Sequence, residues 1–494
     1  MSALSHYPSA GTVTRAIHWI TWRIWFNDIS RSLGSRTRAR LVLWVLGVAM
    51  VAWTVYSGLA LGRQLGLDTD TAREISTPVA GVVFTLPGLA TLMACLYAPN
   101  RTVLTEMLSV LPVHPAHVKS SLRWLTVIVG TVAGVLMGAP LILQFIVSGD
   151  PLTAVAGTGF AFYLAVLGAL FVHILLSTFR TAISWSVRSD GVMVQGIAGL
   201  LVAALMVYSF FRALPFNYQE PAGPLAILGN VLAWLLGGPR PSAMVLVLVA
   251  AAPGVLLLLS HMLDRVPEPR ENNRAQSRTF ATASGMLGNS LLALEIKQHL
   301  RFPANAVLLL FINGLAIAAI VVTWIAGGDE YGATYLVLTI VSAFGIGAYG
   351  PTRRHHWVYR VTGAPHAWIL PKFLSVTVIW AVMILIYGTA LVLWSGWYFI
   401  DLVAALPVLF IEMAAGCLIG LLLPVSREQS IGGAVSEAVA LVGLIGLTFA
   451  VQTLIAVAGD VLLGLALQLA IAALLVAAYL LTARWLSGNQ DVTG

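Results

Sequence analysis

Three ionisable residues stand inside apolar stretches of this sequence, where they could do chemistry. Glu412 lies in the middle of "PVLFIEMAAGCLIGLLLP", Glu437 lies in the next apolar stretch, and His173 lies in "LFVHILLSTFR". An ionised carboxylate at the centre of a bilayer costs about 3 kcal/mol or more without a partner. Each side chain is therefore either a site on a translocation path or a neutral, hydrogen-bonded contact between helices.

Two glycines follow Glu412 on the same expected helix. Gly416 and Gly420 form a Gly-x-x-x-Gly pair, which lets two helix backbones approach closely. The pair favours a packing role for this helix and a structural role for Glu412. The other interpretation, a proton-coupling site that faces a wet cavity, stays open.

The motifs of soluble enzymes are missing from the sequence. None of its three lysines, Lys119, Lys297 and Lys372, follows a glycine, so it has no phosphate-binding Gly-x-x-x-x-Gly-Lys-Ser/Thr loop. It also lacks His-Glu-x-x-His, Cys-x-x-Cys and Gly-x-Ser-x-Gly. Its two cysteines lie in apolar stretches and imply neither a disulfide framework nor a zinc site. We expect no metal and no cofactor on this chain.

The composition shows which solvent the chain must face. Of 494 residues, 59% are hydrophobic and 10% are charged, whereas an average soluble domain has about 25% charged residues. A helix crosses a bilayer in about 20 apolar residues, and stretches of this kind occur six times on each side of residues 264–304. We expect an all-α polytopic membrane protein of about twelve transmembrane helices, arranged as two six-helix halves.

The basic residues predict the orientation, because cytoplasmic loops carry an excess of Lys and Arg. With the N-terminus in the cytoplasm, all but four of the 27 basic residues fall on the cytoplasmic side; the exceptions are Arg63, Arg73, Arg212 and Arg240. We therefore expect a multi-pass protein of the cell membrane with both termini in the cytoplasm. Since the basic residues serve topology, the net charge of +7 predicts no nucleic-acid partner.

Each expected half opens with an amphipathic segment. The first, "AIHWITWRIWFNDISRSLGSRTRAR" at 16–40, mixes isoleucine and tryptophan with arginine. The second, at 289–304, repeats Leu292, Ile296 and Leu300 at every fourth position. Its charged residues lie on other faces: Glu295, Lys297 and Arg301. Both segments are typical of interfacial helices on the inner leaflet.

These features predict a linear order of segments. A basic N-terminal segment precedes the first half, and a polar linker and the second interfacial helix precede the second half. An apolar piece in the external segment 212–242 is too short to span and predicts a surface-lying or re-entrant helix. The expected boundaries are 1–40, 41–263, 264–288, 289–304, 305–484 and 485–494.

A basic cytoplasmic loop joins the second and third spans of each half. The loops are "APNRTVLTEMLSVLPVHPAHVKSSLRW" at 98–124 and "GPTRRHHWVYRVTGAPHAWILPKF" at 350–373. Both contain a helix-forming part, a proline break, histidine, and a cation where the next span begins, namely Arg123 and Lys372. The cluster of Arg353, Arg354, His355 and His356 is either a solvated basic face that enforces topology or a protein-docking surface.

This layout resembles the permease subunits of ABC-2 type exporters, in a fused form with both halves in one chain. "LEIKQHLRFP" is similar to the family's pattern before the first span of a half, and "SVLPVHPAHV" is similar to its loop pattern. The second loop departs from that pattern, because Thr362 and Gly363 stand where Leu-Pro is expected. Lys372 stands where the family tends to place a basic residue.

The resemblance implies a division of labour. A separate cytoplasmic ATPase, in two copies, would bind ATP and Mg and would dock on coupling helices at about 102–118 and 352–368. The implied docking residues are Arg101, Glu106, His114, His117, Arg353, Arg354, His355, His356, Arg360 and His366. The chain itself would not be an enzyme. It would export a small hydrophobic or amphipathic substrate, such as an antibiotic, a peptide or a lipid.

The translocation path would run between the halves, along helices at 77–98 and 431–456, with Glu412, Glu437 and His173 as candidate path residues. Two other classes of protein fit parts of the sequence. An ion-coupled secondary transporter also has twelve spans in two repeats, and it would use Glu412 without any ATPase. A membrane-embedded enzyme would need polar groups that converge at one depth, whereas this sequence has scattered single residues.

Overall fold

The structure is a computed structural model. It describes residues 9–65, 76–97, 108, 113–147, 151–186, 191–213, 224–264, 266, 290–301, 309–317, 320–321, 338–339, 341–394, 398–423, 443–444, 446–447, 450–451 and 461–489. All regular structure in these residues is helical, which confirms the predicted all-α class.

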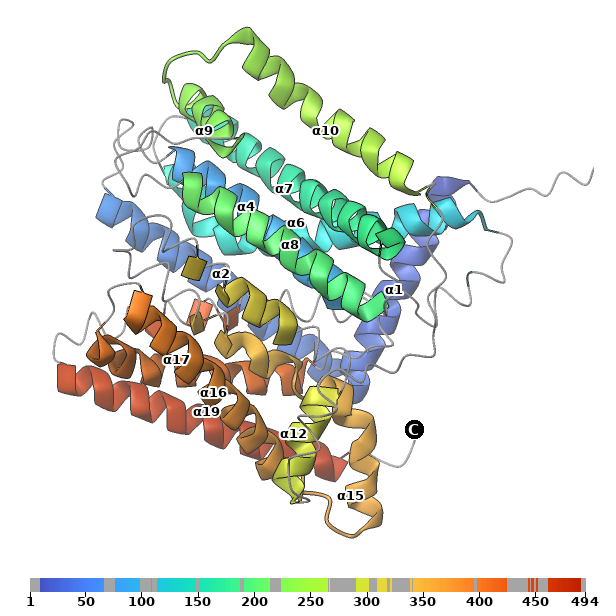
Figure 1. The fold of residues 1–494 in the computed structure, drawn as a ribbon, viewed down its shortest axis with the longest axis vertical. Coiled ribbons are helices and arrows are strands. Elements are labelled where there is room, and N and C mark those ends of the chain that lie inside the picture. The colour runs from blue at the N-terminus through green and yellow to red at the C-terminus, as the bar shows by residue number, and fades with distance from the viewer. Residues whose placement is uncertain are drawn as a thin grey trace, which may run out of the picture.

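The helices before residue 265 form one group, in the upper part of Figure 1. They are α1 (Ala10–Ser32), α2 (Arg36–Leu65), α4 (Ser76–Tyr97), α6 (Pro115–Val147), α7 (Pro151–Ser186), α8 (Gly191–Ala213), α9 (Pro224–Leu235) and α10 (Ala243–Asp264). The short apolar α9 occupies the place where a surface-lying or re-entrant helix was expected between the last two spans. Helix α4 is central, because it packs against α6, α7, α8 and α9.

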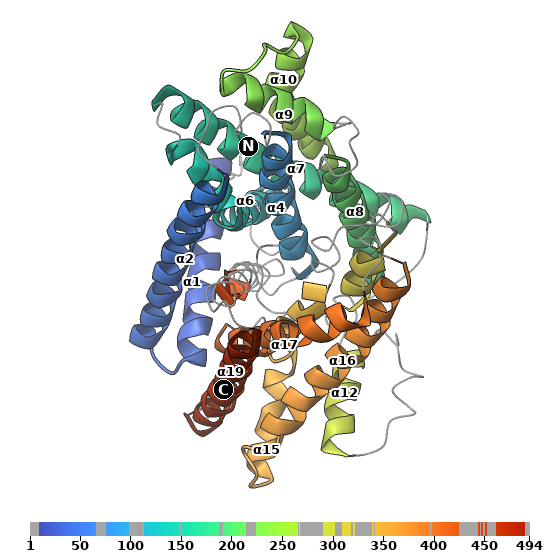
Figure 2. The ribbon, with the colours of Figure 1, turned by 90° about the vertical axis from the view of Figure 1, so that its left-hand side faces the viewer.

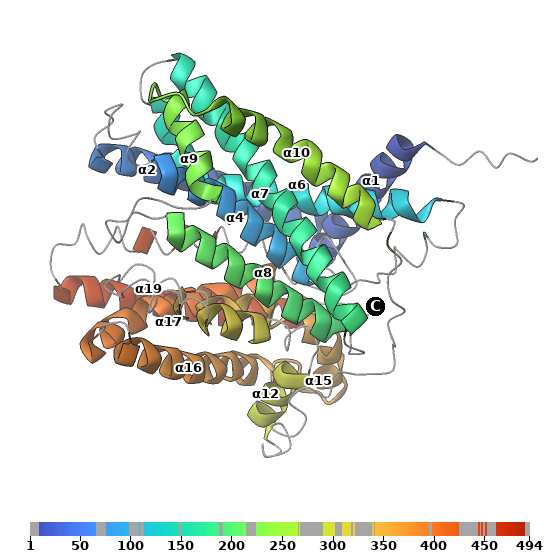
Figure 3. The ribbon, with the colours of Figure 1, turned by 45° about the horizontal axis from the view of Figure 1, so that its top comes forward.

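The helices after residue 290 form the lower part of Figure 1. They are α12 (Leu291–Arg301), the 3-10 helices η1 (Ala343–Gly347) and η2 (Gly350–His356), α15 (Trp357–Val361), α16 (Ile369–Trp394), α17 (Phe399–Leu422) and α19 (Val461–Asn489). Figure 3 shows α16, α17 and α19 running side by side, with α12 and α15 at one end of them. We call that end of the molecule the α12 end.

Eight helices in the described ranges are long and apolar enough to cross a membrane. By length and composition they support a polytopic helical membrane protein, and they correspond to α2, α4, α6, α7, α10, α16, α17 and α19. Helix α8 contributes a shorter apolar stretch, Val194–Ser209. The expected spans at 301–329 and 428–460 lie largely outside the described residues. In the expected span at 330–353 the structure describes residues 338–339 and 341–353, which contain η1 and the start of η2 and no long α-helix. The number twelve therefore stays a prediction.

Small residues set the closest helix contacts. Gly168 of α7 lies against the backbone of Phe84 in α4, and Gly420 of α17 lies against the backbone of Ile346 in η1. A Cβ atom at either glycine would collide with the facing carbonyl group. Gly416, one turn earlier, leaves a Cβ 3.4 Å from the Ile346 side chain. The glycine pair after Glu412 therefore serves close packing, as its spacing predicted.

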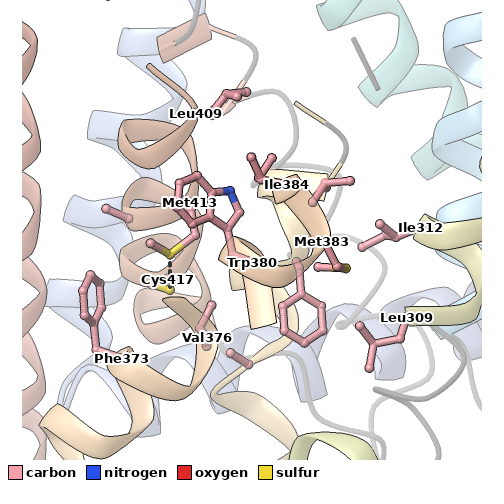
Figure 4. Packing of buried hydrophobic residues seen from close by; sticks show 14 of the residues in the cluster. Leu309, Ile312, Phe373, Val376, Trp380, Met383, Ile384, Leu409, Met413 and Cys417 are labelled. Atoms are coloured by element: carbon pink, nitrogen blue, oxygen red, sulfur yellow. Dashed lines mark hydrogen bonds between the residues drawn. The ribbon is translucent and has the colours of Figure 1, made fainter. Parts of the chain in front are cut away.

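Two buried clusters form most of the apolar interior. One is built mainly from α4, α7, α8 and α9, and it also takes in Phe311 and Leu315 from beyond residue 300. The other is built from residues 309–486, and Figure 4 shows part of it, with Trp380 of α16 beside Met413 of α17 and Met383 of α16 on the side of Leu309 and Ile312. Buried side chains from both parts of the chain thus meet in one cluster.

Helix α1 lies across the α12 end and touches both groups. It runs steeply across the ends of the neighbouring helices in Figure 1 and lies beside α2 in Figure 2. Every fourth residue on one face is buried: Val13, Ile17, Thr21, Trp25, Ile29 and Leu33. The first part of this face packs on residues at the start of α6, and the last part packs on Leu422 and Leu423 at the end of α17.

Candidate functional site

The buried face of α12 is partly polar, which differs from the expected pattern. Ser290 begins the helix, because its hydroxyl accepts from the backbone N–H of Ala293 at 3.2 Å. Glu295 and His299, one turn apart, are 1% and 0% exposed, whereas Leu291 and Leu294 are exposed. The sequence placed Glu295 away from the packing face. That expectation is wrong, because α12 turns its carboxylate into the protein.

Lys372, near the start of α16, is the reason that Glu295 can be buried. Its Nζ donates to Glu295 Oε2 at 2.6 Å, and both side chains are 1% exposed. A buried ion pair adds little net stability over a well-packed apolar pair, but the removal of one partner strands a charge and costs about 3–5 kcal/mol. The pair therefore fixes α12 to the first turn of α16. Moving the two side chains apart would leave a buried charge without its partner.

Tyr359 of α15 completes the coordination of the carboxylate. Its hydroxyl donates to Glu295 Oε1 at 3.1 Å. Burial, followed by the charge and the hydrogen bond of Glu295, raises the pKa of Tyr359 from 10 to about 12. The phenol therefore stays a neutral donor at physiological pH. Glu295 thus joins three elements, α12, α15 and α16, through its two oxygens.

His299 makes a second contact between α12 and α16. Its Nε2 lies 3.1 Å from Ser375 Oγ, and the Ser375 hydroxyl donates to the carbonyl oxygen of Lys372 at 2.7 Å. The serine oxygen therefore accepts from the imidazole N–H. Burial, and then the charge of Lys372, hold the pKa of His299 well below its ordinary value of 6.5. The imidazole is neutral in the folded protein.

The second predicted coupling loop is an ordered element that η2 and α15 form. His356 is buried and stacks on Trp368, with ring centroids 4.1 Å apart. The expectation of an entirely solvated basic face is therefore wrong for His356. Gly363, with a φ of +75°, reverses the chain after α15, and the N–H of Ala364 donates to the carbonyl of Tyr359 at 2.9 Å.

The tip of this loop exposes apolar side chains. Val358 and Val361 of α15 are 44% and 76% exposed. They lie three residues apart and so share one face of the helix. Tyr359, between them, points back to Glu295. Helix α15 is therefore held to α12 by the Tyr359–Glu295 hydrogen bond, while Val358 and Val361 stay exposed.

The helices before residue 265 carry a related contact between α1 and α6. His18 Nε2 donates to the carbonyl oxygen of Ser121 at 3.0 Å, and Thr14 Oγ1 lies 2.9 Å from Ser121 Oγ. Thr14 and His18 are four residues apart, as are Glu295 and His299. In both places a helix that precedes the long helices uses a histidine to hold a buried serine near the start of one of them.

Each group also ties this region to the end of its last helix. Arg123 of α6 forms an ion pair with Asp264 of α10 at 2.6 Å and also donates to the carbonyl of Ser260. In the other group, His366 Nδ1 lies 2.6 Å from Ser487 Oγ of α19. The two cations that the loop comparison matched therefore have different partners, since Lys372 binds α12 and Arg123 binds α10.

The remaining predicted docking residues, and Lys297 and Arg301 of the predicted interfacial helix, differ in their surroundings. His114 is exposed and His117 half-buried at the start of α6, with ring centroids 5.5 Å apart. Arg353 and Lys297 are half-buried, on η2 and α12 respectively. The structure describes only the backbone of Arg301, Arg354, His355 and Arg360, and Arg101 and Glu106 lie outside the described residues.

The two candidate path residues that the structure describes, Glu412 and His173, have different partners. Glu412 is 0% exposed, and its Oε1 accepts from Thr339 Oγ1 at 3.4 Å. His173 Nδ1 lies 3.6 Å from Cys95 Sγ, which joins α7 to α4. Glu437 lies outside the described residues. Glu412 and His173 each contact a neighbouring helix, which fits the structural interpretation of both.

Sequence reasoning missed four members of the site: Tyr359, His299, Ser375 and His18. The shared four-residue spacing of Thr14–His18 and Glu295–His299 was the signal that could have found the histidines. The hydrogen bonds and the ion pair of this site have a structural role, because they hold α12, α15 and α16 together. Comparison of the chain with protein-family models, with curated proteins and with solved structures finds no match.

Proposed function

We propose that this chain is the membrane permease of an ABC-2 type exporter, driven by a separate cytoplasmic ATPase that docks at the α12 end. The observation that carries the proposal is the construction of α15. It is a short helix with an apolar exposed face, Val358 and Val361, and it is fixed to α12 and α16 through Glu295. A push on α15 is thereby transmitted directly to a long apolar helix.

The orientation in this proposal follows the basic residues, which place the α12 end in the cytoplasm. Two ATPase copies would bind ATP and Mg and would contact the η2–α15 loop and its counterpart near 102–118. The substrate would be hydrophobic or amphipathic, because the long apolar helices offer few fixed charges for an ionic solute. Antibiotics, peptides and lipids fit this chemistry.

Purification of the tagged chain from its native membrane in mild detergent tests the proposal. We expect a soluble ATPase to copurify and to hydrolyse ATP. The triple variant Arg353→Glu, Arg354→Glu and Arg360→Glu should lose this partner, while Arg240→Glu, a change at an exposed arginine at the opposite end, should keep it. Elution of the wild-type chain without an ATPase would contradict the proposal.

A second candidate, an ion-coupled carrier, depends on Glu412. Its burial at 0% exposure within α17 is compatible with a protonatable site. Reconstitution separates the two candidates, because a carrier moves substrate in proteoliposomes under a proton gradient with no ATPase present. Glu412→Gln would abolish that transport in a carrier and would leave ATP-driven export largely intact in a permease.

A further inference from the structure

The exposed face of α1 is unusual in its chemistry. Opposite the buried face lie Arg15, Trp19, Trp22 and Arg23, at spacings of four, three and one. Trp19 and Trp22 are each 58% exposed, and the Arg23 guanidinium lies 4.6 Å from the Trp19 ring centroid. We call these four residues the Arg-Trp face. Two large indoles beside two guanidinium groups match the boundary between headgroups and acyl chains.

The charged residues around this face are almost all positive. Residues 9–40 contain six arginines and a single acid, Asp28. All six arginines are exposed: Arg15, Arg23, Arg31, Arg36, Arg38 and Arg40. Guanidinium groups bind phosphate oxygens in a bidentate manner, and the cytoplasmic leaflet carries anionic lipid. A neutral membrane surface would use the indoles but would leave the six cations without counter-ions.

We propose that the Arg-Trp face of α1 binds anionic phospholipid headgroups of the inner leaflet. This inference rests on the orientation given under the proposed function. Because α1 packs on α6 with one part and on the end of α17 with the other, the lipid-bound helix connects both groups of helices at the membrane surface. Anionic lipid would therefore hold the two groups together at the α12 end.

Hydrogen exchange of the full chain in lipid nanodiscs tests this inference. The nanodiscs contain phosphatidylcholine with increasing fractions of phosphatidylglycerol in both leaflets, so the result does not depend on orientation. We expect phosphatidylglycerol to slow exchange in residues 10–32. In the double variant Arg15→Gln and Arg23→Gln, protection at a given phosphatidylglycerol fraction should fall, because each arginine removed lowers the equilibrium constant for lipid binding about fivefold.

The control is Arg240→Gln, which removes an exposed arginine far from α1 and should leave the lipid dependence unchanged. Trp19→Ala with Trp22→Ala should reduce protection even in pure phosphatidylcholine. Equal protection of wild-type α1 with and without phosphatidylglycerol would overturn the inference. So would protection of α1 that requires an added ATPase, since the face would then be a protein-docking surface. The nanodiscs contain no ATPase, so failure here leaves the proposed function intact.

Discussion

Lys372 and Glu295 are the residues on which the rigidity of the α12 end depends. Each is 1% exposed, and each lies within reach of further polar groups, Tyr359 Oη for Glu295 and the imidazole of His299 near Lys372. A charge in such a place is stable only with its partner. The site therefore behaves as a unit in which single changes are more harmful than paired ones.

Replacement of Lys372 by methionine should lower the stability of the protein strongly. The change strands the Glu295 carboxylate, so we expect a loss of about 3–5 kcal/mol, measured as a lower Tm in mild detergent. Adding Glu295→Gln should restore much of the loss, because it removes the stranded charge. Lys297→Met, on the same helix but half-buried, serves as the control and should change the Tm little.

We predict that the protein loses stability in mild acid because His299 is buried in its neutral form. Its pKa is depressed in the folded protein, so the unfolded chain binds a proton below pH 6.5 that the folded chain does not bind. The contribution of His299 to the free energy of unfolding is therefore fully present above pH 6.5, and the free energy of unfolding falls as the pH drops below this value. A Tm series from pH 7.5 to 5 should show this decline, and His299→Gln should flatten it. His114→Gln, at an exposed histidine, should leave the slope unchanged.

At the scale of elements, the close contact between α17 and η1 depends on Gly420 more than on Gly416. Gly420→Ala would place a methyl group against the backbone carbonyl of Ile346, so we expect a loss of about 1–3 kcal/mol. Gly416→Ala meets a side chain at 3.4 Å and should be tolerated. The two variants, compared by thermal denaturation, are matched in chemistry and differ only in position. Equal effects would contradict this packing.

The sequence predicted elements better than it predicted the contacts between them. The amphipathic character of α1, the glycine pair in α17 and the cation at the start of α16 could all be identified, because each is a local feature of the sequence; which residues of α1 are buried was not predicted. The partner of Lys372 is 77 residues away, and nothing local indicates that Glu295 turns inward. The burial of His356 against Trp368 was missed for a similar reason, since the fold of the loop after α15 brings the two rings together.

At the scale of the whole molecule, the α12 end combines several kinds of connection. Glu295 fixes α15 to α12 and α16, Arg123 fixes α6 to α10, and α1 crosses from α6 to α17. Motion of α15 would thus reach helices on both sides of the molecule. In the proposed function, a separate cytoplasmic ATPase would drive export by moving α15. The docking of this ATPase at the α12 end is the central claim of the proposal.

Photo-crosslinking from Val361 tests that claim most directly. A photoreactive phenylalanine analogue at this exposed position is activated in native membranes, and the crosslinked product is identified by mass spectrometry. The account predicts a soluble ATPase crosslinked to residue 361, and no such product from Val247, an exposed residue of α10. Crosslinks from residue 361 only to lipid, or only within the chain, would contradict it.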